Sequence, residues 1–329
     1  MIDLDVRLDS SLLDDEYGYL SRLQQKETKD IKVLIPGENN REDYLKARET
    51  YLEVLQTEDA IKWAITSLIH RLYRQGSYYL EIAITPYLHQ KEGLTNRRIL
   101  NAALNSMYQA MNACPGIECD LVVYCHRQAP NADNLELVNL LVEYKGERIA
   151  AMGLEGDDIG APLNNYQTLF RRASKAGLPI FIELPTVNAD QKYIDKAISL
   201  GAKRIIAPYC LEFDRQKVIE YGSKQIYFEF RPTFDIINGY LEKYEDLPLK
   251  KYWSECQFPG FIAGCSYGLC EATLVHECVI VQQKNDFKPS DVQHALYNAS
   301  LARYGTLHEK SKLAANLTKN FVNFHKKTV

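Results

Sequence analysis

The chain has 329 residues, which is enough for one α/β barrel of roughly 250 residues with insertions, or for two ordinary domains. Hydrophobic residues make up 46% of the sequence and charged residues 25%, as in soluble globular proteins, so extensive disorder is not expected. The sequence has 39 Lys and Arg residues and 43 Asp and Glu residues, which gives a net charge of −4, and there is no long basic block. We therefore expect no nucleic-acid partner.

The amino terminus shows neither the basic leader nor the apolar core of a signal peptide. No apolar run approaches the roughly 18 residues that a membrane helix needs. We therefore expect a cytoplasmic protein without a membrane partner, whose eight cysteines are reduced thiols. No Cys-x-x-Cys pair occurs, and the step from Cys265 to Cys270 is not a zinc-ribbon spacing.

Eight short apolar runs bounded by turn residues alternate with longer segments of helical periodicity. This alternation is typical of repeated β-α units that build a parallel sheet. In chain order, the runs are Ile2 to Leu8, Tyr79 to Ile84, Asp120 to Cys125, Arg148 to Leu154, Pro179 to Leu184, Arg204 to Ala207, Gln225 to Phe230 and Gly260 to Gly264.

Apolar residues at steps of three and four predict helices between the runs, within an insertion that spans residues 9–77, and after the eighth run. The predicted helices are Asp43 to Leu55, Glu58 to Arg74, Asn131 to Tyr144, Tyr166 to Ala176, Ala189 to Leu200, Arg215 to Tyr221, Pro289 to Tyr304 and Glu309 to His325. The pattern predicts an α/β fold of the (β/α)₈ TIM-barrel type, with a helical insertion after strand 1 and carboxyl-terminal helices. An open doubly wound sheet is the alternative. No repeat or linker divides the chain, so we expect one domain over residues 1–329.

In such a barrel the chemistry lies at the carboxyl ends of the strands and in the loops that follow them. Polar side chains occupy most of these positions. They are Asp5, Arg7 and Asp9; Glu81 and Thr85; His126 and Arg127; Glu155 to Asp158; Glu183 and Thr186; Ala207 to Tyr209; Arg231; and Cys265 and Ser266.

The same segments, in the same order, resemble the adenosine deaminase family over nearly the whole chain. Leu4 to Ser11 resembles the family's Leu-His-x-His-Leu-Asp-Gly-Ser, and Tyr79 to Pro86 its Tyr-x-Glu-x-Arg-x-x-Pro strand. Further similar segments are Leu154 to Asp158 (Leu-x-Gly-x-Glu), Gly177 to Thr186 (Gly-Leu and a strand ending His-Ala-Gly-Glu), Gly201 to Pro208 (Arg-Ile-Gly-His-Gly), Pro232 to Asp235 (Pro-Thr-Ser-Asn) and Gly264 to Tyr267 (Thr-Asp-Asp-Pro).

The resemblance implies a zinc site, but this chain departs from the family at the residues that would form it. The positions of the family's three histidine ligands and its aspartate ligand carry Asp5, Arg7, Glu183 and Cys265. The proton-transfer glutamate is replaced by Thr186, the assisting histidine by Ala207, and a second aspartate by Ser266.

Arg7 is the decisive departure, because its guanidinium stays protonated and has no lone pair to give a metal. We therefore predict no metal and no cofactor. Without zinc, bound water keeps a pKa far from neutrality, and the hydroxyl of Thr186 does not titrate in the useful range. Arg7 is expected to form a buried ion-pair cluster with Asp5 and Glu183. This cluster either only holds the barrel together or lets Arg7 bind an anionic or carbonyl group of a ligand.

The resemblance further implies that Asp9 contacts a ribose and that the backbone of Gly156 meets a purine ring. Alternatively, Asp9 only caps the following helix and Gly156 only permits its backbone angles. The predicted ligand-binding set is Asp5, Arg7, Asp9, Gly156, Glu183, Thr186, Cys265 and Ser266. The catalytic residues are unknown, with Glu183, Cys265 and His126 as weak candidates. Glu81 and Asp158 are acid–base candidates that more commonly pair with an arginine.

The leading hypothesis is an adenosine-deaminase-like protein without the zinc site, which binds a purine nucleoside or related small molecule without zinc-dependent deamination. One alternative is an active hydrolase with a rebuilt site, and another is a scaffold or regulatory subunit. The sequence leaves open whether the protein is an enzyme, and it is compatible with an oligomer.

Overall fold

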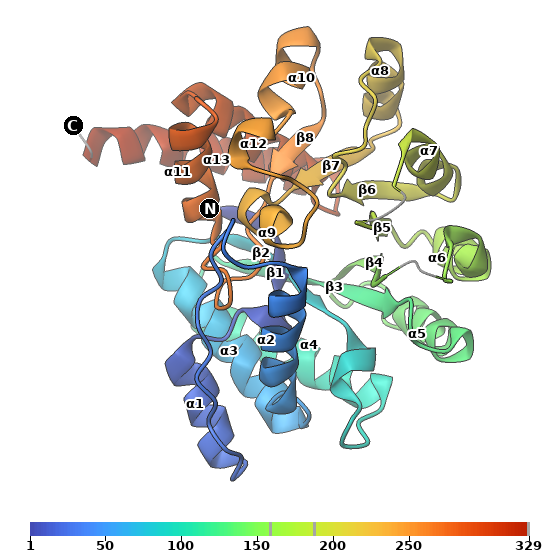
Figure 1. The fold of residues 1–329 in the computed structure, drawn as a ribbon, viewed down its shortest axis with the longest axis vertical. Helices are drawn as coiled ribbons and strands as arrows, with labels where there is room; N and C mark the ends of the chain where they lie inside the picture. Colours follow the sequence, from blue (N-terminus) through green and yellow to red (C-terminus); the bar gives the residue numbers. More distant parts are fainter. Residues whose placement is uncertain (158–159, 187–188, 328–329) are drawn as a thin grey trace.

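The computed structural model of the protein describes residues 1–157, 160–186 and 189–327, with side chains up to Leu317. Eight parallel strands form one sheet in the order β1 to β8, each hydrogen-bonded to the next. The backbone N–H of Arg7, at the end of β1, donates to the carbonyl of Cys265 after β8 at 3.1 Å. Helices surround the curled sheet (Figure 1), which confirms the TIM-barrel-like α/β fold.

Every predicted apolar run contains a strand, and the ends agree within two residues. The strands are β1 (Ile2–Arg7), β2 (Tyr79–Ile84), β3 (Glu118–His126), β4 (Ile149–Glu155), β5 (Ile180–Glu183), β6 (Ala202–Ile206), β7 (Tyr227–Phe230) and β8 (Gly260–Ile262). They coincide with the runs because both faces of a parallel sheet in a barrel are covered, which requires near-continuous apolar sequence.

The predicted helices are all present, and the sequence analysis missed five others. Those it predicted are α2 (Arg41–Glu53), α3 (Glu58–Arg74), α5 (Asn131–Glu143), α6 (Gln167–Lys175), α7 (Gln191–Ser199), α8 (Arg215–Ser223), α12 (Pro289–Ala302) and α13 (Leu307–Lys327). Those it missed are α1 (Asp14–Leu23), α4 (Asn96–Ala113), α9 (Pro232–Ile237), α10 (Leu249–Glu255) and α11 (Leu274–Lys284). α4 begins with an ordinary amino-terminal signal, since the Thr95 side chain accepts from the N–H of Arg98.

The main apolar core lies between the sheet and the surrounding helices, and a smaller cluster lies in the barrel interior. The interior cluster includes several alanines, which leave room for a buried charge. The guanidinium of Arg204 lies 3.8 Å from the ring centroid of Phe181 and pairs with Glu81 at 2.8 Å and Glu229 at 3.3 Å. The inside of this barrel is therefore partly ionic.

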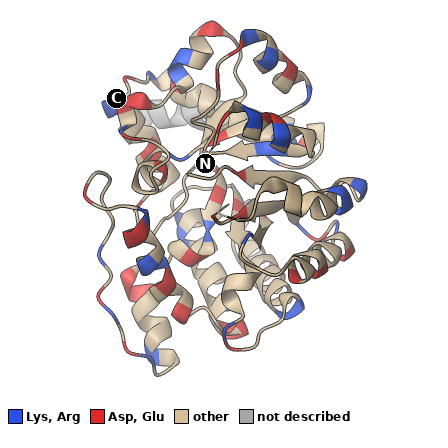
Figure 2. Ribbon diagram, turned by 45° about the vertical axis from the view of Figure 1, so that its right-hand side comes forward, with Lys and Arg blue, Asp and Glu red and all other residues tan. Residues whose placement is uncertain are grey.

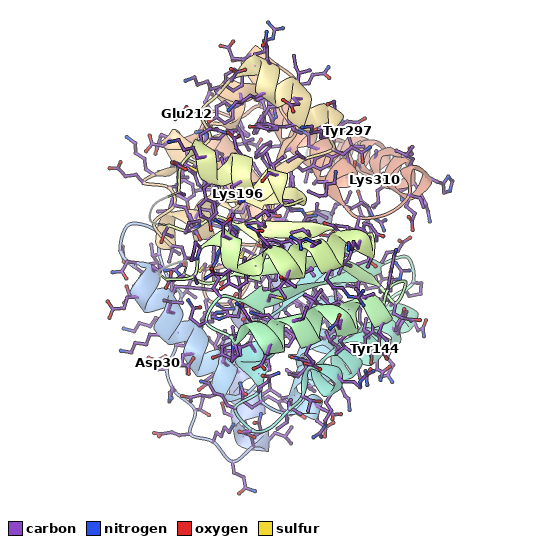
Figure 3. All side chains as sticks on the ribbon, turned by 90° about the vertical axis from the view of Figure 1, so that its right-hand side faces the viewer. Asp30, Tyr144, Lys196, Glu212, Tyr297 and Lys310 are labelled. Atoms are coloured by element: carbon purple, nitrogen blue, oxygen red, sulfur yellow. The ribbon has the colours of Figure 1, made fainter. Side chains whose placement is uncertain are left out.

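The outer helices carry acidic and basic residues side by side (Figure 2). Seen from the side, α5, α6 and α7 stack next to one another outside the sheet (Figure 3). None of the helices in the described part of the chain has the length and hydropathy that crossing a bilayer requires. All eight cysteines are free thiols, as predicted.

Candidate functional site

A buried cluster of charged side chains fills the carboxyl end of the barrel. It combines residues from β1, β4, β5, the segments after β1 and β7, and helices α2 and α9. We call it the mouth cluster, and it consists of Asp5, Arg7, Asp9, Arg48, Glu155, Glu183, Arg231 and Asp235. Each of these residues is buried.

Arg7 lies near the centre of the mouth cluster. Asp5 and Arg7 are two positions apart in a strand, so both side chains point to the barrel interior. The guanidinium of Arg7 donates to Glu155 at 2.5 Å and to Glu183 at 2.7 Å, while Asp5 lies 3.6 Å from its Nε. The predicted ion pairs with Glu183 and Asp5 are therefore both present, and Glu155 is a further partner that lies closer than Asp5.

Arg231 is a second arginine at the same place, to which the sequence analysis assigned no role. It follows β7 directly and is fully buried. Its guanidinium pairs with Glu183 at 2.8 Å, Asp235 at 3.0 Å and Asp5 at 3.2 Å. Glu183 is thus held by two arginines, one on each carboxylate oxygen.

Arg48 is the third arginine, and sequence reasoning missed it altogether. It reaches the mouth from α2 and donates to Asp9 from Nε at 2.9 Å and from Nη2 at 2.5 Å. The same Nη2 donates to Glu155 at 3.0 Å. Asp9 caps no helix, since α1 begins only at Asp14, so the capping interpretation was wrong.

Other side chains of helix α2 also contact the region of the mouth. The ring of Tyr44 meets that of Phe234 edge to face at 4.9 Å between centroids. Arg41 pairs with Asp157 at 2.6 Å. These contacts cover the α2 side of the mouth cluster.

The arginines keep two carboxylates of the cluster ionised. Burial alone raises the pKa of the Glu183 carboxyl, but Arg7 and Arg231 outweigh burial and lower that pKa to about 2. Burial also opposes ionisation of Glu155, yet Arg48 and Arg7 hold its pKa well below its usual range. Neither group carries a proton to donate near neutral pH, which makes Glu183 a poor general acid.

Cys265 and Ser266 lie buried beside the cluster. Burial raises the pKa of the Cys265 thiol well above its ordinary value, which is the opposite of what an activated nucleophile needs. The Ser266 hydroxyl donates to the carbonyl of Ser10 at 3.2 Å. Thr186 lies three residues past β5 and is half-buried.

Gly156 and His126 form the rim on the β3 and β4 side. Gly156 has a φ of +100°, and a Cβ there would lie 2.6 Å from Oε1 of Gln128 and 3.3 Å from Nε2 of His126. The His126 ring stacks on Tyr87 at 5.3 Å, and burial lowers its pKa. Asp158, also named from the sequence, lies outside the described residues.

The charged network continues from the mouth down the barrel axis. Glu81 faces the interior and pairs with Arg204, the commoner of its two predicted roles. Glu229 links Arg204 to the mouth, because it lies next to Asp5. Burial first, and Asp5 second, raise the pKa of the Glu229 carboxyl well above its ordinary value.

Ala207, at the position matched to the family's assisting histidine, adopts a left-handed backbone. Its φ is +56°, which is uncommon for a residue with a Cβ, and its N–H donates to the carbonyl of Glu229 at 3.0 Å. Such backbone outliers are frequent at functional sites. Within the described ranges, no group of three or more His, Cys, Asp or Glu side chains is arranged to hold a metal ion.

Comparison with known proteins agrees with this geometry at the level of the fold and family. A family model described as adenosine deaminase matches residues 17–320. The adenosine deaminase of Clostridium kluyveri is 27% identical over 262 residues, which cover 77% of this chain and 75% of the relative. That of Haemophilus ducreyi is 24% identical over 289 residues, covering 85% and 82%. The solved structure of adenine deaminase from Arthrobacter aurescens superposes with a TM-score of 0.81 at 18% identity, over 97% of this chain and 98% of that one.

Proposed function

This chain belongs to the adenosine deaminase family, and on that premise we propose that it is a metal-independent member. It binds a purine nucleoside or a related small molecule at the barrel mouth without zinc-dependent deamination. The observation that carries this proposal is the occupation of the acidic side chains by guanidinium groups. Both oxygens of Glu183, both of Glu155 and one of Asp5 face an arginine.

The donor set at the mouth does not fit a zinc ion. Zinc in proteins is bound by imidazole, thiolate and carboxylate groups, with three protein ligands at a catalytic site. Here there is no imidazole among the matched positions, and Arg7 and Arg231 compete for Asp5 and Glu183. Two fixed cations within hydrogen-bond distance of the carboxylates repel a divalent ion.

Metal content is the direct test of this part of the proposal. We expect protein expressed in zinc-supplemented medium to contain far less than one metal ion per chain by plasma mass spectrometry. The adenosine deaminase of Clostridium kluyveri, purified in parallel, serves as a control for loss of metal during purification. Zinc at one ion per chain, lost on replacement of Asp5 or Glu183, would refute metal independence.

Ligand binding is tested separately at the rim. We expect adenosine, inosine or adenine to raise the melting temperature of the protein without release of ammonia, since a ligand that binds only the folded state stabilises it. Gly156→Val should abolish this shift, because Gly156 lies on the half-buried rim and any Cβ there crowds Gln128 and His126. Gly93→Val is the matched control. It imposes a similar backbone strain, since Gly93 has a φ of +84°, but places its side chain in open space.

If Gly93→Val loses the ligand-induced shift as Gly156→Val does, the rim is not the binding site. Ammonia release from adenosine by the metal-free protein would instead favour an active hydrolase with a rebuilt site.

A further inference from the structure

Arg127 differs from every other buried arginine in the described part of the chain. Arg7, Arg48, Arg204, Arg231 and Arg303 each pair with at least two carboxylates. Arg127 is equally buried, with 4% of its surface exposed, and no described carboxylate lies within ion-pair distance of it. A buried charge without a counter-charge costs several kcal/mol, so this position requires an explanation.

The hydrogen bonds of Arg127 leave most of its donors unused. Nη2 donates to the carbonyl of Glu183 at 3.2 Å and to the hydroxyl of Tyr193 at 3.1 Å. Nε and Nη1 are buried and have no described hydrogen-bond acceptor. Since Nε carries one N–H and Nη1 two, three donors of a permanent cation remain available.

Arg127 is also held in place at the edge of the candidate site. It follows the last residue of β3, its backbone N–H donates to the carbonyl of Glu155 at 3.0 Å, and its own carbonyl accepts from the hydroxyl of Tyr166 at 2.9 Å. Glu155 and Glu183, which meet Arg7 through their side chains, thus meet Arg127 through their backbone carbonyls. Arg127 therefore lies beside the mouth cluster and on the side of the half-buried rim residues His126 and Gly156.

We propose that Arg127 binds an oxyanion, a phosphate monoester or carboxylate, carried by the ligand of the barrel mouth. A negatively charged group supplies the counter-charge that no described residue provides, and its oxygens accept hydrogen bonds from the unused N–H donors. Because Nε and Nη1 are buried in this structure, binding of the group requires a local rearrangement of the side chains around Arg127. This inference rests on the proposed function, and it specifies an anionic rather than a neutral ligand.

The first experiment uses inorganic phosphate and acetate as probes, without a purine. At constant ionic strength set with chloride, we expect phosphate, acetate or both to raise the melting temperature of the full chain, and their relative effects identify the preferred oxyanion. Arg127→Gln should lose this shift, and Arg127→Lys should keep part of it because the charge remains. Arg97 is a half-exposed arginine of α4 that pairs with Glu143 of α5, and Arg97→Gln should behave as wild type.

The second experiment compares adenosine 5′-monophosphate with adenosine by calorimetry. For a phosphate site, we expect the monophosphate to bind about tenfold more tightly than adenosine, as a charge-assisted hydrogen-bonding site allows. Arg127→Gln should remove most of this ratio while leaving the affinity for adenosine within about threefold.

Anion shifts that are absent in wild type, or equal in wild type and Arg127→Gln, would refute the inference. A purely structural role for Arg127 predicts that Arg127→Gln melts at a lower temperature by the same amount with and without anion. If Arg127→Gln does not fold, Arg127→Lys decides, since unchanged anion binding in that variant contradicts a specific guanidinium site. An anion shift that requires Arg127, without binding of adenosine or its monophosphate, would refute the proposed purine ligand and leave the oxyanion site standing.

Discussion

Replacing Arg7 by methionine is expected to destabilise the protein by about 3–5 kcal/mol, the usual effect of removing one partner from a buried ion pair. Methionine fills a similar volume, but Glu155 and Glu183 each lose Arg7, which is one of the two arginines that each of them contacts. Urea unfolding at pH 7 measures the loss. At lower pH the penalty should shrink, because protonation relieves the carboxylates that Arg7 no longer neutralises.

Two further variants separate this effect from loss of packing. Adding Glu183→Gln to Arg7→Met should recover part of the lost stability, since the amide removes one of the negative charges that Arg7 no longer neutralises. Arg97→Met is the surface control, because its pair with Glu143 is about half exposed and should contribute less than about 1 kcal/mol. A loss below about 1 kcal/mol for Arg7→Met would show that the mouth cluster does not stabilise the fold.

Glu277 should make the protein less stable as the pH rises from about 4.5 to 8. This residue of α11 is fully buried, and both its oxygens accept from the N–H of Thr233. Burial raises the pKa of its carboxyl to about 8. The folded state therefore holds a proton that the unfolded chain releases above its ordinary pKa, and each pH unit in this window removes about 1.4 kcal/mol of stability.

Glu277→Gln keeps an acceptor and abolishes the titration, so it isolates this contribution. Relative to wild type, the variant should gain about 4 kcal/mol between pH 4.5 and pH 8, and the difference should be constant below pH 4.5. The stability of wild type must be subtracted from that of the variant at each pH, because other groups titrate in the same pH range. One of them is the Met1 amine, whose pKa burial lowers to about 5. Glu143 has an exposed carboxyl with a lowered pKa, and Glu143→Gln should show no such trend above pH 5. A flat difference for Glu277→Gln would mean that this carboxyl is ionised in the folded protein.

The strands were predictable because each is a short apolar run that a covered parallel sheet requires. The sequence also placed Arg7 and Glu183 at strand ends that meet in a barrel, and they do form an ion pair. Glu81 was recognisable in the same way, as a carboxylate within an otherwise apolar run. These predictions depend on local pattern and on the known closure of the fold.

The rest of the mouth cluster depends on contacts that no local pattern specifies. Arg48 belongs to a hydrophilic helix, and contacts between residues far apart in the sequence, such as the packing of Tyr44 on Phe234, bring that helix over the mouth. Arg231 was visible as a residue at a strand end, but its partners come from β1, β5 and α9. The sequence also could not show that Arg127 lacks a carboxylate partner among the described residues, because this depends on where its neighbours lie in the fold.

The shared partners of Arg7 and Arg231 also restrict how such a site can change by mutation. Each arginine serves at least two carboxylates, and Glu183 is bound by both. Exchanging one of the two arginines for a neutral histidine leaves the acids with fewer counter-ions and retains the other cation beside Asp5 and Glu183. If the site is metal-independent as proposed, a variant that binds zinc therefore requires several of these positions to change together.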